Sequence, residues 1–513
     1  MSFSMNQMAK ATWPVIVLLL CGWWSVTHKR TNVAVRPILA TLTIAADERD
    51  GPAAALTASQ LASRSGATFY LAPAAMGGRD SNSGLSTGAP WLSPNHSLQC
   101  GDVILAAPSA SYDSANFISG HWGKVYCPNE KNVAWLKCAR FDACKIISNS
   151  GPAGMLVDQS YWGVQGWEVT TTAGAVWGGC FLAVPNDRQP QGLHHIIFAN
   201  NVANGCQASG FASSNRRERA SVDYLAIVGN VAYNAAQSNT ECYSGISINE
   251  PIQSDSAPGT HIYVAGNFSY GNYDPDPCAG GAPFDGEGLI FDTFDGSVSR
   301  MSSPYGAQAL AENNILIGNG GRGLQVGYNN SGRPPFATIY LRHNTMWGNN
   351  RDGHQNVKGC GELNLNRTTS TIARYNLVET SSATGCGNNP IYAISVTQSD
   401  STVQVEQNIA FSPSGTSLKS WRNGAFSYGS TNIVKVDPAF VNPVVPGPPN
   451  CGTSSSVPDC MAPMIADFTP KAAQAIGFGY QVPNSAPTYD PLFPQWLCNV
   501  NLPRGLVKMG CRA

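Results

Sequence analysis

The sequence predicts an all-β protein built as a single-stranded solenoid, that is, a parallel β-helix. Short apolar segments that end in asparagine recur through the middle of the chain, and these asparagines are 29, 37, 47, 30, 32 and 32 residues apart. A repeat of this length, with short β-runs and no amphipathic helix between them, indicates a coil of strands. The segments end at Asn201, Asn230, Asn267, Asn314, Asn344, Asn376 and Asn408.

The repeated asparagines have a physical role in such a coil. Each amide donates to the next coil, about 4.8 Å away, so a stack of asparagines satisfies its own hydrogen bonds. Several segments continue alike, from Asn230 to Asn234, from Asn314 to Asn319 and from Asn344 to Asn349. Propeller blades are longer and need four strands each, and the leucine pattern of leucine-rich repeats is absent, so neither architecture fits.

The N-terminus indicates export. Residues 1–30 hold an apolar run from Trp13 to Val26, followed by Lys29 and Arg30. This run is short for a membrane span and typical of a signal-peptide core. A signal anchor is the alternative, because the basic pair follows the run. We expect a secreted, periplasmic or extracellular protein with no integral membrane domain beyond that possible anchor.

Composition narrows the partners and the compartment. Only 12% of the 513 residues are charged and the net charge is −1, so bulk charge attracts the chain neither to nucleic acid nor to an anionic membrane. The 15 cysteines include no Cys-x-x-Cys pair, which argues against zinc knuckles and thioredoxin-like motifs. In an exported protein they indicate disulfides. We expect a local Cys138–Cys144 loop, and tail disulfides among the four cysteines after residue 450.

The chain divides into four parts. Residues 1–30 are the signal or anchor, and the Ala/Thr-rich residues 31–65 are a linker. Residues 66–440 form the β-helix with its N-terminal cap. Residues 441–513 are rich in Pro and Cys, and we expect them to cap the last open turn, because exposed strand edges invite aggregation. We expect a monomer.

A family resemblance rests on motifs at both ends of the coil. Phe69 to Pro73, Asp80 to Gly84 and Pro90-Trp91 open it, and Asp437 to Val441 close it. With the asparagine-ended coils, they resemble right-handed parallel β-helix proteins of the pectate-lyase superfamily, over about residues 67–480. The resemblance implies the fold more than the activity, because the superfamily includes lyases, hydrolases, epimerases and non-catalytic proteins.

A second strand in each coil aligns by its apolar alternation, over residues 244–250, 287–293, 322–328 and 361–367. Alternate residues such as Leu289 and Phe291 point into the coil, and the others point outward. The longest loops of the repeat flank this polar outward face, which predicts a binding wall. The substrate-binding candidates are Asn249, Glu250, Gln325, Tyr328, Asn364, Asn366 and Arg367.

The most concentrated group of potentially reactive side chains is a cluster of four acidic residues in a chain with few charged residues. They are Asp285, Glu287, Asp292 and Asp295. They indicate a Ca²⁺ site, because Ca²⁺ takes six to eight oxygen ligands. They also suit a pair of acid/base carboxylates. In a third interpretation they end strands, and Glu287 pairs with Arg322 on the next coil. Strict alternation separates Asp292 from the other three, so convergence needs a bend.

Asp274 and Asp276 precede this group and are possible further ligands, with solvated loop carboxylates as the alternative. His194 and His195 have no partner at metal spacing, so we interpret them as structural.

Other charged residues indicate structure more than chemistry. Neighbouring coils set Glu312 beside Arg342, and Arg374 beside Glu406, as ion pairs. His343 shares its position with other side chains of the repeat and is assigned to packing. The basic residues Arg351, His354 and Lys358 lie in one loop and are freer candidates for a site.

If the resemblance extends to function, it implies Ca²⁺-assisted β-elimination on a uronate polymer. Ca²⁺ would neutralise the sugar carboxylate, and a basic side chain would take the neighbouring proton. The catalytic candidates are Arg322, Glu287, Asp292 and Arg351. Arg322 is the best-placed base, although an arginine beside Glu287 is costly to deprotonate. No lysine stands in the aligned strand columns.

Two alternatives stay open, a non-catalytic glycan-binding or cell-surface β-helix protein and a glycoside hydrolase with paired carboxylates. A groove of amides and aromatic rings suits sugars without any catalysis. Most tryptophans in such folds instead pack against loops. The aromatic candidates are Trp162, Trp167, Trp177, Tyr328 and Trp347.

Overall fold

The computed structural model describes the chain from residue 66 onward. The predicted signal and linker therefore lie outside the described residues, as do Trp177, Asp276, His354 and Lys358. The described ranges are 66–128, 132–151, 153–173, 179–185, 192–214, 222–237, 242–275, 285–296, 304–330, 334–353, 360–381, 386–387, 389–421, 426–482, 489–503 and 511.

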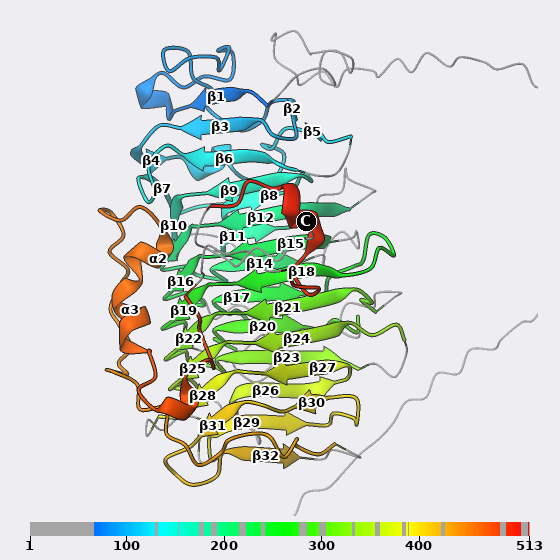
Figure 1. Cartoon of the computed structure of the whole chain (residues 1–513). Coiled ribbons are helices and arrows are strands. Elements are labelled where there is room, and N and C mark those ends of the chain that lie inside the picture. The colour runs from blue at the N-terminus through cyan, green and yellow to red at the C-terminus, as the bar shows by residue number, and fades with distance from the viewer. Residues whose placement is uncertain are drawn as a thin grey trace, which may run out of the picture. The chain divides into compact units, whose positions relative to one another are not determined.

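Each coil contributes one strand to each of three long parallel sheets, which we call sheets 1, 2 and 3. Figure 1 shows the coils stacked in chain order from β1 to β32. Connections between parallel strands of one sheet are right-handed in nearly all proteins. The predicted right-handed parallel β-helix is confirmed, and a small pair, β2 (Leu98–Gln99) and β5 (Val125–Tyr126), accompanies its first coils.

Sheet 1 has eleven described strands: β1 (Thr68–Leu71), β3 (Val103–Ala106), β6 (Ala134–Cys138), β9 (Trp162–Gln165), β12 (Leu193–Ala199), β15 (Val222–Val228), β18 (Thr260–Ala265), β21 (Gln308–Glu312), β24 (Thr338–Arg342), β27 (Thr371–Arg374) and β30 (Gln404–Val405). Sheet 2 has ten: β4 (Ser109–Tyr112), β7 (Cys144–Ser148), β10 (Trp167–Thr171), β13 (Val202–Asn204), β16 (Val231–Tyr233), β19 (Phe268–Tyr270), β22 (Ile315–Ile317), β25 (Thr345–Trp347), β28 (Leu377–Glu379) and β31 (Ile409–Phe411).

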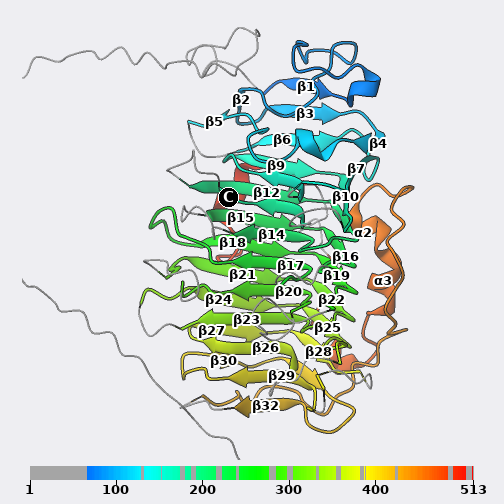
Figure 2. The same cartoon turned by 180° about the vertical axis from the view of Figure 1, so that it is seen from behind.

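Sheet 3 carries the predicted binding face and is best seen in Figure 2. Its nine described strands are β8 (Ala153–Val157), β11 (Gly179–Ala183), β14 (Phe211–Ser214), β17 (Ile246–Asn249), β20 (Leu289–Asp292), β23 (Leu324–Asn329), β26 (Gly361–Thr368), β29 (Tyr392–Thr397) and β32 (Leu418–Trp421).

The predicted asparagine ladder stands at the corner between sheets 1 and 2. Asn314 is typical, since its Nδ2 donates to Oδ1 of Asn344 at 2.9 Å and to the carbonyl of Val264 at 3.0 Å. Its own Oδ1 accepts from the amide nitrogens of Asn267 at 3.0 Å. The ladder runs from Asn201 to Asn408 as predicted, and continues to Asn432.

A second ladder stands at the corner between sheets 2 and 3, where Asn272 donates to Asn319, and Asn319 to Asn349. Asn234 does not join this series, although its segment continues like those that end at Asn319 and Asn349. Ala235 occupies the ladder position, and Asn234 lies before it with a φ of 51°. A left-handed residue at this point turns the chain from one sheet to the next, and Asn tolerates that conformation well.

The interior and the covalent links agree with the sequence pattern. The alternate residues predicted to face inward, among them Leu289, Phe291, Leu324 and Val326, are fully buried in one continuous core. The local Cys138–Cys144 bridge and two tail bridges, Cys451–Cys460 and Cys498–Cys511, are formed. Further disulfides join Cys100 to Cys127, Cys180 to Cys206 and Cys360 to Cys386.

The C-terminal segment, described over 440–482, 489–503 and 511, corrects a prediction. Instead of covering only the last turn, it runs along the coil with helices α2 (Val457–Cys460) and α3 (Ala462–Asp467) (Figure 1). Its apolar residues, including Val457 and Phe468, bury outward-facing residues of sheet 2 such as Phe268 and Ile315. These outward apolar residues are the physical reason for its course, because water would otherwise cover them.

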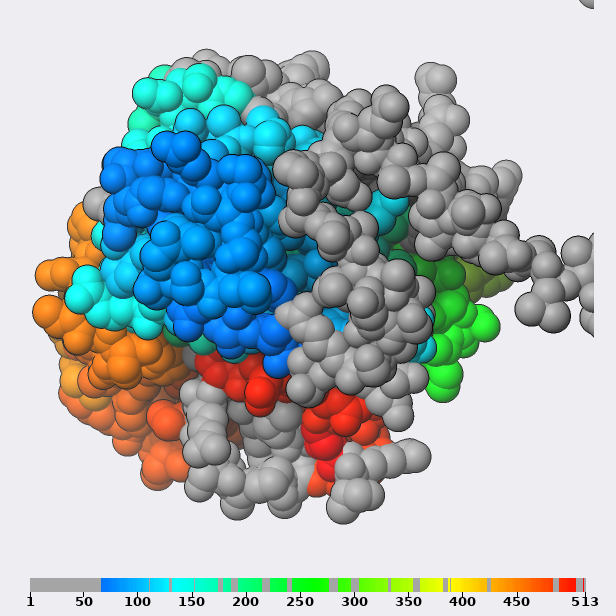
Figure 3. All heavy atoms as spheres, turned by 90° about the horizontal axis from the view of Figure 1, so that it is seen from above, coloured from blue at the N-terminus to red at the C-terminus, as the bar shows by residue number. Residues whose placement is uncertain are grey.

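The same segment then crosses to sheet 1. Phe493, Leu497 and Val500 pack there against outward residues that include Ile197 and Tyr263. Figure 3 shows the two parts, in orange and red, against different sides of the coil. No helix within the described ranges is both long and apolar enough to cross a membrane.

Candidate functional site

Sheet 3 differs from the other two long sheets in what covers it. The C-terminal segment packs on the outward faces of sheets 1 and 2. The hydrophobic clusters of the described residues join no part of that segment to the outward face of sheet 3. We call this outward surface, over β17, β20, β23, β26, β29 and β32, the sheet 3 face.

The predicted columns of the sheet 3 face have the predicted register. Asn249 stands opposite Asp292, which stands opposite Gly327, which stands opposite Asn366. The inner column runs through Ser247, Ile290, Gln325 and Asn364 in the same way. The alignment made from apolar alternation therefore gives the strand pairing residue for residue.

The two columns differ in exposure, and part of the prediction is wrong. Gln325 and Asn364, predicted to be exposed, are only 8% and 6% exposed, and Glu250 is 1% exposed. Asn364 uses its Nδ2 to donate to the Ser395 hydroxyl at 2.7 Å, so its polar group is engaged in the stack. The alternation of apolar residues along a strand predicts the face to which a side chain points. It does not predict how closely other groups pack around that side chain, and so it does not predict its exposure. The more accessible members are Asn249, Asp292, Tyr328, Asn366 and Arg367.

Asp292 is the half-buried carboxylate of the outer column. Asn249 donates to its Oδ2 at 2.9 Å from the preceding coil, and the Thr293 hydroxyl donates to its Oδ1 at 2.9 Å. A carboxylate that accepts a hydrogen bond on each oxygen is held in one orientation. This geometry suits a group that contacts a sugar hydroxyl or exchanges a proton with a substrate.

Glu287 and Arg322 form the ion pair that their register predicted. Nη1 of Arg322 donates to Oε1 of Glu287 at 2.8 Å, and the Ser244 hydroxyl donates to Oε2 at 3.0 Å. Both charged residues are buried, at the entry to β20 and β23. The pair stabilises Arg322 in its charged form, which counts against its predicted role as a base. That catalytic role stays a prediction.

Asp285 has the most perturbed environment of the acidic group. Burial, followed by the nearby carboxylates of Glu287 and Asp292, raises the pKa of Asp285 well above its usual value, and Arg322 only partly offsets this. Asp285 therefore keeps its proton to a higher pH than an ordinary aspartate does. The Asp285 carboxyl lies within electrostatic range of Asp292, which accepts hydrogen bonds.

The fit of these carboxylates to a Ca²⁺ ion is incomplete. Within the described residues, no three His, Cys, Asp or Glu side chains are grouped as metal ligands would be. Both oxygens of Glu287 already accept hydrogen bonds. Asp295 follows β20 at its far end, where its backbone nitrogen donates to the Tyr328 carbonyl at 2.9 Å. The Ca²⁺ site stays a prediction.

Other predicted site residues lie elsewhere. Arg351 follows β25 at the corner between sheets 2 and 3, where its Nε donates to the Gly348 carbonyl at 2.8 Å and its guanidinium lies 5.8 Å from the Trp347 ring. Trp162 and Trp167 are buried in the core, and Trp347 is buried against Phe468 of the C-terminal segment, so these three have packing roles.

Several predicted packing roles are confirmed. Glu312 accepts from Arg342 at 2.6 Å, and Arg374 pairs with Glu406. His343 stacks on Tyr375 with ring centroids 5.4 Å apart. His195 stacks between Tyr161 and Tyr224. These contacts place the residues in the scaffold of sheet 1 and its corners.

Sequence reasoning missed the last two strands of the sheet 3 face. Ser395 of β29 and Lys419 of β32 extend the column of Asn364, and Thr397 and Trp421 extend the column of Asn366. The signal was available in the continued alternation of residues 392–397. The short β32 contains only one apolar inward residue, Leu418, which is too little for a pattern.

The chain matches no family model, and no curated protein matches it. Several solved structures are similar to it. Pectate lyase Pel9A is 14% identical, with a TM-score of 0.41 over 84% of this chain and 95% of that one. The GH136 lacto-N-biosidase from Eubacterium ramulus is 13% identical, with a TM-score of 0.35 over 72% and 68%. The A-module of the Azotobacter vinelandii mannuronan C-5 epimerase AlgE4 is 13% identical, with a TM-score of 0.32 over 65% and 89%. Identities this low say nothing about activity.

Proposed function

We propose that this protein binds a carbohydrate polymer along the sheet 3 face and cleaves it as a polysaccharide lyase acting on uronate residues. One observation carries the proposal: the outward face that the C-terminal segment leaves uncovered among the described residues presents amides, a carboxylate and an aromatic ring. Asn249, Asn366, Asp292 and Tyr328 supply them. A few polar groups beside aromatic surface are typical of sites that bind small organic ligands.

The proposal places the protein outside the cytoplasm. The disulfides of the coil and of the tail form and persist in oxidising compartments. Extracellular polymers are found in the same compartments, so export and substrate agree.

A lyase removes the C5 proton next to the uronate carboxylate, the C4–O bond breaks, and the electron pair forms a C4–C5 double bond while the leaving oxygen gains a proton. The ion pair with Glu287 keeps Arg322 cationic. Arg322 therefore suits stabilising negative charge more than accepting a proton. A bound Ca²⁺ would neutralise the sugar carboxylate, and its predicted ligands are Asp285, Glu287, Asp292 and Asp295.

A hydrolase is the second candidate, and a specific observation favours it. Asp285 has a raised pKa, and Asp292, within its electrostatic range, accepts two hydrogen bonds. A protonated carboxyl beside a carboxylate is the arrangement with which glycosidases protonate the leaving oxygen and assist the attack at the sugar.

The experiment is to incubate the disulfide-intact protein and Ca²⁺ with pectate, alginate and glycosaminoglycans. Ultraviolet absorbance of the unsaturated product supports the lyase, and new reducing ends without absorbance support the hydrolase. Binding without either signal supports a glycan-binding protein, and absence of binding to any polymer rejects the proposal. Asp292→Asn should lower either activity about 100-fold. Glu406→Gln, which changes a carboxylate on sheet 1, is the matched control.

The Ca²⁺ prediction has its own measurement. Calorimetric titration of Ca²⁺ into Asp285→Ala, Glu287→Ala and Asp292→Ala should show weakened binding relative to the unmodified protein. Undiminished affinity in all three variants removes the site.

A further inference from the structure

Two cations at the C-terminal end of the sheet 3 face are held by aromatic rings. The guanidinium of Arg367 lies 5.0 Å from the centroid of the Tyr328 ring, and its Nε donates to Oε1 of Gln398 at 3.1 Å. The ammonium of Lys419 lies 5.9 Å from the Tyr392 ring and 5.8 Å from the Trp421 ring. Ring faces attract a cation without neutralising it.

Lys137 and Arg351 also lie over aromatic rings, but four other cations of the coil are neutralised by carboxylates. Arg322 pairs with Glu287, Arg342 with Glu312 and Asp490, Arg374 with Glu406, and Lys145 with Glu168. Among the described residues, neither Arg367 nor Lys419 has a carboxylate within ion-pair distance. In a chain with few charges, two unneutralised cations on one face leave that end of the face positive.

The two cations are offset both along the coil axis and across the sheet. Arg367 follows Asn366 near the end of β26, and Lys419 stands in β32, two strands further along and in the column of Asn364. Two strand spacings correspond to about 10 Å along the axis, and the three residues between the two columns add about 10 Å in the strand direction. Between them β29 presents Ser395 and Thr397, and Gln398 follows it. Positive charges at this separation, with hydroxyl and amide groups between them, match a polymer that carries repeated negative groups.

We infer that Arg367 and Lys419 form an anion subsite that binds carboxylate or sulfate groups of a polysaccharide, with Tyr328, Tyr392 and Trp421 as its aromatic walls. The inference rests on the proposed function and adds which residues bind the acidic groups of the polymer away from the carboxylates of Asp285 and Asp292. A guanidinium binds a carboxylate or a sulfate through two parallel hydrogen bonds. The subsite is separate from Asp285 and Asp292, so it selects the polymer without taking part in bond cleavage.

The test is affinity electrophoresis and calorimetry of the full chain against two acidic polymers, alginate and a sulfated galactan, and one neutral polymer, xylan. Arg367→Gln and Lys419→Gln should each weaken binding to the acidic polymer about tenfold, and reduce the salt dependence of binding. Arg374→Gln, which removes an ion-paired cation from sheet 1, should leave the affinity unchanged. Equal melting temperatures show that all variants are folded.

Each outcome has a separate meaning. Loss of alginate binding in both variants assigns the subsite to carboxylates, and loss of galactan binding assigns it to sulfates. Acidic-polymer binding that survives in the Arg367→Gln/Lys419→Gln double variant overturns the inference and leaves the proposed function intact. Binding to xylan alone overturns it as well. Failure of the unmodified protein to bind any polymer rejects the proposed function itself.

Discussion

The two corners that flank sheet 2 solve one structural problem with different chemistry. At the corner between sheets 1 and 2, the amide ladder runs from Asn201 to Asn432, coil after coil. At the corner between sheets 2 and 3, the ladder of the described residues consists of Asn272, Asn319 and Asn349, and Asn349 then donates to Glu362. Neutral amides are thus replaced by a buried carboxyl group.

The second corner also concentrates other buried charges. Glu287, Arg322, Asp274 and Asp352 are buried there, next to the entry strands of the sheet 3 face. Burying charge opposes folding unless each group is paired, so a fold that needed only a corner would keep the amides. The regular corner is therefore scaffold, and the irregular corner adjoins the surface where we propose chemistry.

Removing an asparagine from the ladder between sheets 1 and 2 should cause the largest loss of stability. Asn314→Ala removes the acceptor of Asn267 and leaves the Val264 carbonyl without its side-chain donor. We expect unfolding free energy to fall by about 4 kcal/mol, because several buried groups lose their partners together. Denaturant melts measure it. Asn366→Ala, on the half-buried sheet 3 face, is the matched control and should change stability by less than about 1 kcal/mol. Equal losses in the two variants would contradict a special role for the ladder.

Removing one partner of the ion pair between Glu287 and Arg322, at the corner between sheets 2 and 3, should cause the second largest loss of stability. Arg322→Met leaves Glu287 buried with only the Ser244 hydroxyl as a donor, and we expect a loss of about 3 kcal/mol. The double variant Glu287→Gln/Arg322→Met should recover most of it, since no charge is then buried alone. A double-mutant cycle measures the coupling. A single variant as stable as the unmodified protein would show that the pair contributes nothing to the fold.

The sequence predicts the corner between sheets 1 and 2 better than the corner between sheets 2 and 3. The ladder and the register of β17, β20, β23 and β26 follow from a repeated Asn and from period-2 alternation, both of which are local patterns. The course of the C-terminal segment could not be predicted, because the sheet 2 strands it covers, such as β19 and β22, are three residues long and show no alternation. Exposure on the sheet 3 face was predicted wrongly for Gln325, because direction does not reveal what packs above a side chain.

Glu362 should make the stability of the corner between sheets 2 and 3 depend on pH. Burial raises its pKa to about 8, partly offset by hydrogen bonds from Asn349. A carboxyl with a raised folded-state pKa contributes stability at low pH that is lost as the pH rises from its unfolded value through about 8. Glu362→Gln restores an amide to the ladder and does not titrate. At pH 9 we expect it to be more stable than the unmodified protein by about 2 kcal/mol, with little difference at pH 4. An identical pH profile in both proteins would show that Glu362 titrates normally.

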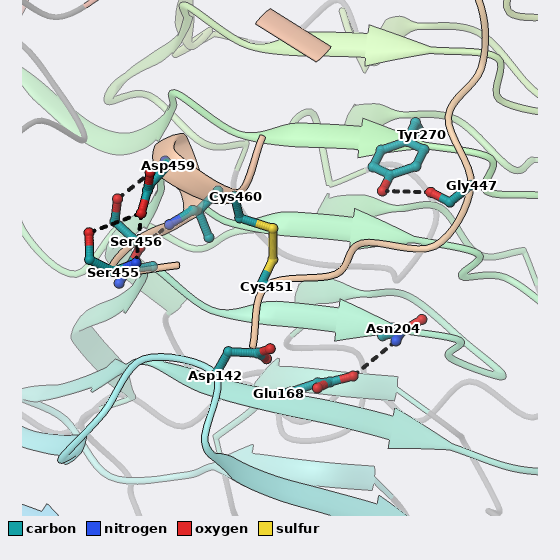
Figure 4. Close-up of a disulfide and its surroundings, with 12 residues drawn as sticks. Asp142, Glu168, Asn204, Tyr270, Gly447, Cys451, Ser455, Ser456, Asp459 and Cys460 are labelled. Atoms are coloured by element: carbon teal, nitrogen blue, oxygen red, sulfur yellow. Dashed lines mark hydrogen bonds between the residues drawn. A yellow bond between two sulfur atoms is a disulfide. The ribbon is translucent and has the colours of Figure 1, made fainter. Parts of the chain in front are cut away.

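The smallest effect is expected where the long ladder stops. The backbone N–H of Trp167 donates to Oδ1 of Asn201. Asp142 of the preceding coil and Glu168, which follows Trp167 in β10, lie beside the Cys451–Cys460 disulfide (Figure 4). Burial and then Glu168 raise the pKa of Asp142 to about 7, against the opposing effect of Lys145.

Stability should therefore fall as the pH rises from about 4 towards 7, the range between the unfolded and folded pKa values of Asp142. Asp142→Asn removes this dependence. We expect the variant to gain about 1 kcal/mol relative to the unmodified protein between pH 4 and pH 8, less than at Glu362 because Lys145 stays close to the carboxyl pair. Thermal melts across this range measure it, and limited proteolysis of the C-terminal segment reports locally. A gain as large as that at Glu362 would show that the carboxyl group weakens the regular corner as much as the irregular one.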